Sequence, residues 1–114
     1  MAVPAVINEQ LTPVGATPEE LYTVPALRRA RVSVYASNDT AGALAAVVHL
    51  VKSGDSVAAT NLLVPNVSVG SKNETAVAGG AAVIYLSAGD AIWAGSNPVN
   101  LVFFANGYED DIPV

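Results

Sequence analysis

The chain lacks cysteine and has few charged residues, and each shortage excludes a class of protein. Without cysteine, its 114 residues cannot form a disulfide-linked scaffold. Charged residues make up 13% of the chain, whereas an average soluble domain has about 25%. Five Lys and Arg stand against ten Asp and Glu, which gives a net charge of −5. The sequence therefore has no basic patch, and we expect no nucleic-acid partner.

Aromatic residues are also scarce, at 6% of the chain, and the hydrophobic content comes mainly from 20 Ala and 18 Val. Hydrophobic residues total 52%, which excludes a disordered chain because disorder requires low hydrophobicity. The length fits a single domain. The excess of apolar side chains must either line a core or be covered by other protein.

Long apolar runs and export signals are missing from the sequence. A membrane-spanning helix needs about 20 consecutive apolar residues. Residues 40–51 and 91–108 lack charge, but the first stretch is too short and the second contains Gly, Asn and Pro. The N-terminus has no basic region that would begin a signal peptide. We therefore expect no membrane partner.

Three prolines lie in the first 18 residues, at positions 4, 13 and 18. Because proline breaks helices and suits an extended chain, residues 1–18 are predicted to form an extended N-terminal arm. The arm is either disordered or docked on a neighbouring molecule. Residues 19–114 are expected to form the folded domain.

The rest of the chain alternates between short β-prone runs and turn-forming residues. These runs predict strands at residues 21–24, 31–38, 43–52, 60–64, 82–87, 91–94 and 99–106. Pro65 is expected to end one strand, residues 95–98 to form a turn, and residues 109–111 to form an exposed acidic terminus. Short strands between turns predict an all-β fold, a small antiparallel β-sandwich of the jelly-roll or immunoglobulin-like type.

Groups that could carry out catalysis or bind a metal are sparse. His49 is the single histidine, and Asp39, Asp55, Glu74 and Asp90 are scattered without the spacing of a calcium loop. The sequence contains no G-x-S-x-G motif and no phosphate-binding glycine motif. We therefore expect no enzyme, no cofactor and no metal site, and we expect His49 to be a strand residue that faces solvent or forms a hydrogen bond in the core.

Residues suited to protein contacts are more evident. Three of the five cations lie within residues 28–31, either as a solvated turn or as a patch that docks on acidic residues such as 109–111 of another copy. Phe103 and Phe104 are adjacent, so in a strand one points outward, toward a second sheet or a subunit interface, unless both sides of the strand are buried within one sandwich. The candidate interface residues are Arg28, Arg29, Arg31, Trp93, Phe104 and Tyr108.

Several short motifs occur in an order that resembles a known family. Residues 21–26 read L-Y-T-V-P-A and are followed by a basic stretch and a strand that ends in Ser37-Asn38. Residues 86–90 read L-S-A-G-D, and a closing aromatic strand runs from Val99 to Gly107. Over residues 20–108 this order resembles the small β-sandwich virion structural proteins of tailed bacteriophages. The chain departs from the family where Leu27-Arg28 replaces Gly-Lys, and in an Ala- and Gly-rich stretch at residues 79–81.

The resemblance implies a structural protein of the virion, assembled in the host cytoplasm. Such a protein decorates or cements the capsid or forms part of the tail, and it contacts copies of itself and other virion proteins such as the major capsid or tail proteins. The charge distribution agrees, because only six of the 73 residues from Val32 to Phe104 are charged. A free domain needs more charge than this on its strands.

A different class of function is a carbohydrate- or receptor-binding module on the same fold. Sugar sites place aromatic rings beside acids and amides. The residues that fit this description in the sequence are Trp93, Tyr85, Asn97 and Asn100.

Overall fold

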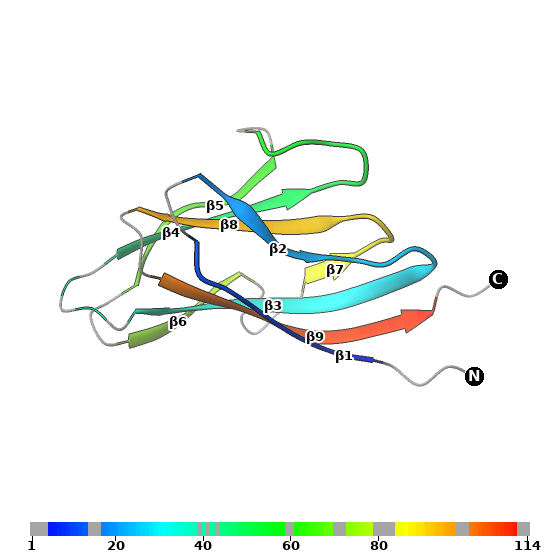
Figure 1. Ribbon diagram of the computed structural model, residues 1–114, viewed down its shortest axis with the longest axis horizontal. Helices are drawn as coiled ribbons and strands as arrows, with labels where there is room; N and C mark the ends of the chain where they lie inside the picture. Colours follow the sequence, from blue (N-terminus) through cyan, green and yellow to red (C-terminus); the bar gives the residue numbers. More distant parts are fainter. Residues whose placement is uncertain are drawn as a thin grey trace.

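The protein is a sandwich of two antiparallel β-sheets, which confirms the predicted fold class (Figure 1). The computed structural model describes residues 5–13, 17–38, 40, 42, 44–58, 61–69, 73–78, 84–97 and 101–111. The five-stranded sheet contains, in order, β1 (Ala5–Leu11), β9 (Leu101–Asp111), β3 (Arg28–Asn38) and β6 (Asn73–Ala78), with β7 (Ile84–Leu86) also paired to β3. The four-stranded sheet contains β2 (Glu19–Thr23), β8 (Ala91–Asn97), β4 (Leu44–Val51) and β5 (Leu62–Val69). The residues described here include no helix that could span a membrane.

The strand order identifies the sandwich as a jelly roll. Strand β1 pairs with β9, β2 with β8, β3 with β6 and β4 with β5, so the strands form a nested set of antiparallel pairs. An immunoglobulin-like sandwich pairs its first two strands in one sheet, whereas β1 and β2 lie in different sheets. Of the two sandwich types that the sequence predicts, the structure is therefore the jelly roll.

Part of the segment predicted to be an N-terminal arm belongs to the sandwich. Residues 5–11 form β1, which is extended as expected and pairs with β9 along its whole length. Ile7 is buried under the sheet, while Val6 beside it points to the outer side and is 74% exposed. The three prolines that indicate an arm lie outside β1, since proline cannot donate a ladder hydrogen bond. β1 is thus an edge strand of the five-stranded sheet.

Three strands continue where the sequence predicts an interruption. β5 includes Pro65, and its register with β4 shifts at this point, which an edge strand tolerates. β8 continues through Gly95 to Asn97 because β4 pairs with it as far as Ala45. β9 continues to Asp111, so residues 109–111 are not a free acidic terminus but are paired with β3.

The core consists mainly of small side chains from the two inner faces. Even-numbered residues of β3 and odd-numbered residues of β9 point inward and meet alternate residues of β4 and β8. The core includes Val32, Val34, Ala36, Phe103, Ala105, Ala46, Val48, Ile92 and Ala94. Phe103 is the largest fully buried side chain. Alanine is a weak strand former, but here its small side chain lets the two sheets approach.

Asn38 is a buried polar residue that fixes the end of β3. Its Nδ2 donates to the carbonyl oxygens of Gly42 (2.8 Å) and Val69 (2.9 Å). Its Oδ1 accepts from the backbone N–H (2.9 Å) and the hydroxyl (2.7 Å) of Thr40. The amide is therefore fully satisfied and holds the β3–β4 connection against β5.

Asp90 has the same role at the opposite end. Its buried carboxylate accepts hydrogen bonds from the backbone N–H groups of Ser87 (3.0 Å) and Ser53 (3.1 Å) and from the Lys52 ammonium (3.3 Å). Burial acts to raise the pKa of Asp90, but the two backbone donors and Lys52 outweigh this effect, so the pKa lies below its ordinary value.

The turn between β2 and β3 carries backbone strain. The N–H of Arg28 donates to the carbonyl of Pro25 (3.3 Å), and Leu27 between them has a φ of 64°. This left-handed conformation favours glycine. The Leu27 side chain is 80% exposed, so packing does not offset the strain.

Candidate binding surfaces

The outer side of the five-stranded sheet carries three rows of side chains that cross the strands. β3 pairs with β9 in one continuous register, and β1 and β7 extend it on either side. Because alternate residues of a strand point to the same side, this register determines which side chains become neighbours. The first row is Val6, Tyr108, Arg31 and Tyr85, the second is Asn8, Asn106 and Ser33, and the third is Gln10, Phe104 and Tyr35.

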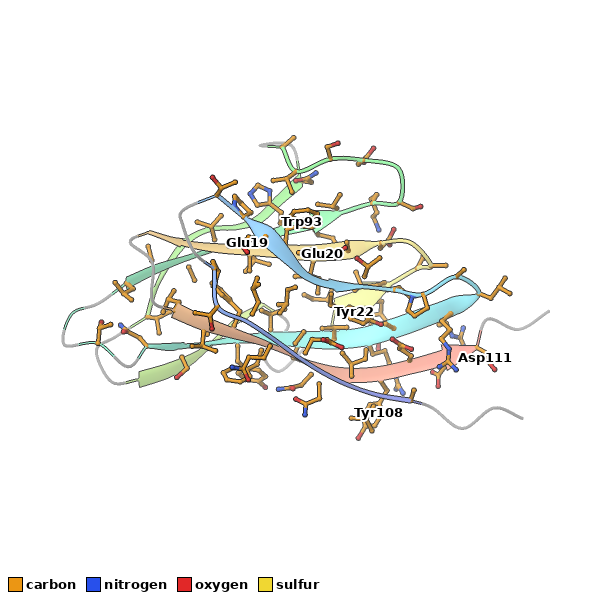
Figure 2. The ribbon with its side chains drawn as sticks, viewed as in Figure 1. Glu19, Glu20, Tyr22, Trp93, Tyr108 and Asp111 are labelled. Atoms are coloured by element: carbon orange, nitrogen blue, oxygen red, sulfur yellow. The ribbon has the colours of Figure 1, made fainter. Side chains whose placement is uncertain are left out.

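A hollow of about 950 Å³ lies over these rows, which we call the trough. Neighbouring rows are about 6.8 Å apart, two residues along an antiparallel strand. The first and third rows hold aromatic rings, and the second row holds only Asn and Ser, so the hollow has aromatic walls and a polar floor. Tyr85 and Tyr108 are 72% and 50% exposed. Figure 2 shows Tyr108 pointing away from the opposite sheet.

Arg31 is the charged residue that lines the trough. Its guanidinium carbon lies 5.9 Å from the centre of the Tyr108 ring, a cation–π contact. Its Nη2 forms an ion pair with Oδ2 of Asp110 at 3.9 Å, which is longer than a hydrogen bond. The Arg31 side chain is 48% exposed. Its donors therefore remain available to a ligand.

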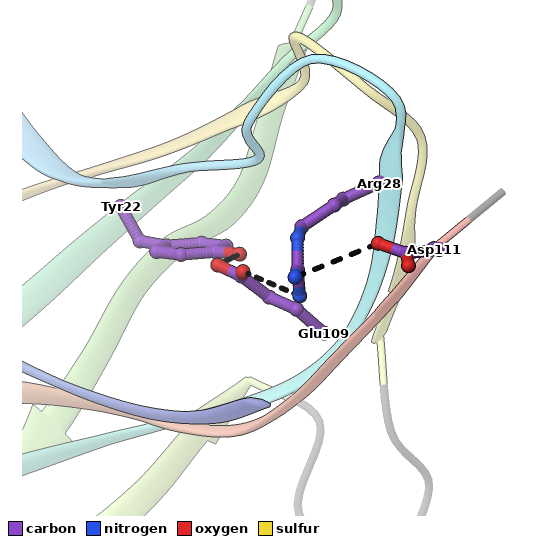
Figure 3. A network of polar contacts seen from close by, with 4 residues as sticks. All are labelled: Tyr22, Arg28, Glu109 and Asp111. Atoms are coloured by element: carbon purple, nitrogen blue, oxygen red, sulfur yellow. Dashed lines mark hydrogen bonds and ion pairs between the residues drawn. The ribbon is translucent and has the colours of Figure 1, made fainter. Parts of the chain in front are cut away.

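Arg28 faces the other side of the same sheet. Its Nη1 lies 3.5 Å from Oε1 of Glu109, and its Nη2 lies 3.5 Å from Oδ1 of Asp111 (Figure 3). The Tyr22 hydroxyl donates to Oε2 of Glu109 at 2.5 Å. Burial of Tyr22 and this bond to a carboxylate raise the Tyr22 pKa well above its ordinary value. The network joins β2 of one sheet to β3 and β9 of the other.

The six predicted interface residues lie on three surfaces. Arg31, Phe104 and Tyr108 meet in the trough, and Arg29 lines a smaller hollow of about 350 Å³ beside it. Arg28 lies in the network between the sheets. Trp93 lies on the opposite sheet (Figure 2).

The acidic residues that the sequence predicts as a docking partner from another copy lie instead beside the arginines of the same chain. β3 and β9 place Arg28 opposite Asp111 and Arg29 opposite Asp110. This register brings the basic and acidic stretches together within one molecule.

The cluster predicted for sugar binding is not brought together. Trp93 lies on β8 of the four-stranded sheet, while Tyr85 lies on β7 of the five-stranded sheet. The side chain of Asn97 and the whole of Asn100 are outside the described residues. The chain crosses between the sheets from β7 to β8, which separates the two aromatic rings.

His49 is a buried strand residue on the outer side of β4, so it forms a hydrogen bond as expected but faces neither solvent nor the core between the sheets. Its Nδ1 lies 2.9 Å from Oδ1 of Asn61. The same oxygen accepts from the Ala58 N–H (3.1 Å), and Nδ2 of Asn61 donates to the Ser56 carbonyl (2.8 Å). These contacts hold the segment after β4 over His49. Within the described part of the chain, no three His, Asp or Glu side chains group as metal ligands would.

The outer side of strands β4, β5 and β8 is a second surface, which we call the uncharged face. The fourth strand of the sheet, β2, borders this face and places Glu20 opposite Trp93. β4, β5 and β8 contain no Asp, Glu, Lys or Arg. Outward positions on β4 and β8 include Ala45, Val47 and Trp93, all half-buried. A hollow of about 480 Å³ beside Trp93 is lined by Pro18 and by the segment after β4, which brings the charged Asp55 to the edge of this face. The segment after β4 thus covers the end of this face that holds Trp93 and His49.

The sequence did not indicate Asn8, Ser33, Tyr35 and Asn106 as binding residues. The alternation in residues 31–38 and 99–106 indicates which of their side chains share a side of a strand. It does not give the pairing between β3, β9 and β1, which places these residues in one trough.

In comparisons with known proteins, the chain matched no family model, no curated protein and no solved structure.

Proposed function

We propose that the protein is a structural component of a tailed-bacteriophage virion, a capsid decoration or cement protein or a part of the tail. It acts by protein–protein contact and not by catalysis. The observation that carries the proposal is the uncharged face. Jelly rolls serve viral capsids but also lectins and cupins, and a fold does not assign a function by itself, so the argument rests on this surface.

In a sandwich, the outward residues of each strand are normally polar, because they face water. On β4 and β8 the outward residues Ala45, Val47 and Trp93 are apolar, as in the core, and the polar His49 among them is covered by the segment after β4. Apolar patches on a protein surface mark interaction sites. Each 100 Å² of apolar surface covered by a partner contributes about 2.5 kcal/mol. A second copy, or another virion protein that covers this face, therefore gains stability from the contact.

The motif order of residues 20–108, which resembles small virion proteins of tailed phages, supports the same proposal. The proposal expects the gene to lie beside genes for a portal, a major capsid protein or tail proteins. It also expects self-association or attachment to heads or tails.

The test is co-sedimentation of the purified chain with heads and tails of the phage whose genome encodes it. Val47→Lys places a charge on the uncharged face, and Ser37→Lys places the same charge on the outer side of the opposite sheet. We expect the wild type and Ser37→Lys to sediment with one of the two structures and Val47→Lys to remain in the supernatant. A wild-type chain that stays in the supernatant with both, and whose measured mass is that of a monomer, contradicts the proposal.

A further inference from the structure

The walls of the trough are suited to flat rings. Tyr85 and Tyr108 stand in the first row, and Tyr35 and Phe104 stand in the third, four residues or about 14 Å away along the strands. A pyranose ring has an apolar C–H face that packs against an aromatic ring. The trough crosses four strands from β1 to β7, about 14 Å at the usual strand spacing. This length exceeds one sugar ring and suits a short oligosaccharide.

The floor of the trough offers hydrogen bonds. Asn8, Ser33 and Asn106 line it, and within the described part of the chain their side chains make no hydrogen bond to another protein group. Two amides and a hydroxyl can donate to and accept from the hydroxyl groups of a sugar. An apolar protein surface placed here would leave these groups unpaired, which is unfavourable. The floor therefore favours a ligand rich in hydroxyl groups over an apolar protein partner.

The charge at the trough favours a ligand of negative charge. Arg31 is the charged residue among those that line it, in a chain with a net charge of −5. The smaller hollow shares Arg31 and Tyr85 with the trough and adds Arg29 and Asp110, two cations and one acid in all. Asp110 forms an ion pair with Arg31 at 3.9 Å, which is longer than a hydrogen bond, so the guanidinium N–H groups are not hydrogen-bonded to this carboxylate. A guanidinium in this position can bind a carboxylate through two parallel hydrogen bonds.

From these three features we propose that the trough binds an acidic oligosaccharide. A sugar ring lies against the aromatic walls, its hydroxyl groups bind the floor, and its carboxylate binds Arg31. This goes beyond the proposed structural role and concerns the opposite side of the sandwich. A protein attached to a particle through the uncharged face would present the trough outward.

The test is a glycan array in which each acidic oligosaccharide, carrying uronic or sialic acid, is paired with its carboxyl-reduced form. We expect the wild type to bind at least one acidic member and to bind the reduced form at least tenfold more weakly. Arg31→Gln is expected to abolish this preference, and Tyr85→Ala to weaken binding at least tenfold. Val47→Lys, which tests attachment through the uncharged face, is expected to bind as the wild type does. Circular dichroism and the thermal midpoint establish that each variant is folded.

Absence of binding to every acidic member by the folded wild type overturns the proposal. Binding that persists unchanged in both Tyr85→Ala and Arg31→Gln also overturns it, because the ligand then lies elsewhere. A dimer of the wild type that Tyr85→Ala converts to monomers shows that the trough is a protein interface instead. None of these outcomes depends on whether the chain sediments with heads or tails, so the two proposals can fail separately.

Discussion

Gly107 is the position where the register of the long β3–β9 ladder can be tested most directly. It pairs with Val32 near the middle of the ladder. A Cβ added at Gly107 would lie 1.8 Å from the carbonyl oxygen of Arg31 and 2.8 Å from its carbonyl carbon, whereas real Cβ contacts essentially never fall below 3.0 Å. The obstructing atoms belong to the backbone, so no side-chain rotation relieves the clash. Gly107→Ala must therefore push the two strands apart.

The cost of Gly107→Ala follows from this displacement. Forcing extra atoms into a packed site costs about 1–3 kcal/mol, and each ladder hydrogen bond weakened by the displacement adds about 1 kcal/mol. Alanine has a lower entropy than glycine in the unfolded chain, which offsets about 0.4–1 kcal/mol of this loss of stability. We expect a net loss of about 2 kcal/mol in the free energy of unfolding. For a chain of this length that lowers the thermal midpoint by about 8 °C.

The measurement is urea unfolding followed by the fluorescence of Trp93, the single tryptophan, with far-ultraviolet circular dichroism as a second probe. Gly42→Ala is the matched control, since a Cβ at Gly42 meets nothing within 4 Å. We expect the control to stay within about 0.5 kcal/mol of the wild type. A loss no larger than this for Gly107→Ala would show that β3 and β9 are not paired in this register. The rows of the trough are derived from the same register, so that result would also contradict the trough.

Three further substitutions test local features, each by the same unfolding measurement. Leu27→Gly relieves a left-handed conformation that costs an L residue about 1–2 kcal/mol. After the greater entropy of glycine in the unfolded chain is subtracted, we expect the free energy of unfolding to rise by about 0.5–1 kcal/mol. A lower free energy of unfolding would contradict the left-handed turn at Leu27. The pKa of Asp90 is lower in the folded chain than in the unfolded chain, so as the pH falls the unfolded chain takes up a proton at this carboxylate first. Wild-type stability should therefore fall as the pH drops below about 4, and Asp90→Asn should flatten this dependence while costing about 1–3 kcal/mol at neutral pH. Tyr22→Phe removes the hydroxyl bound to Glu109 and should cost about 1–2 kcal/mol, whereas Tyr85→Phe, on an exposed ring, should cost nothing measurable.

The all-β class and the inward and outward sides of several strands could be predicted because they depend on local alternation. Val32 and Val34 share the inner side of β3, and Arg31, Ser33 and Tyr35 share its outer side, as the sequence indicates. The two features missed in the five-stranded sheet depend on long-range pairing. β1 is a strand because β9 lies beside it, and the acidic residues after Tyr108 are ordered by the arginines of β3.

The candidate site illustrates the same limit more sharply. Tyr85 and Trp93 are eight positions apart and both point outward, so proximity in sequence favours a common site. They lie on opposite sheets because the chain changes sheet between β7 and β8. Tyr108 and Arg31 are far apart in sequence, yet the ladder makes them direct neighbours. Strand pairing decides which aromatic residues share a surface. Composition and alternation do not predict this pairing.

The low charge of the chain also has a more specific meaning in the structure. Some of its few charges serve contacts within the molecule: Arg28 pairs with Glu109 and Asp111, and Lys52 pairs with Asp90. β4, β5 and β8 contribute none to their outer side. If that side were only a second core, Val47→Lys would destabilise the free chain by several kcal/mol, as a charge placed in a core does. Val47 is half-buried and lies on the outer side of β4, so we expect the loss in the free chain to stay below about 1 kcal/mol. The stability of the free Val47→Lys chain thus separates a core from a contact face, because only a contact face combines a small loss of stability with a large loss of attachment.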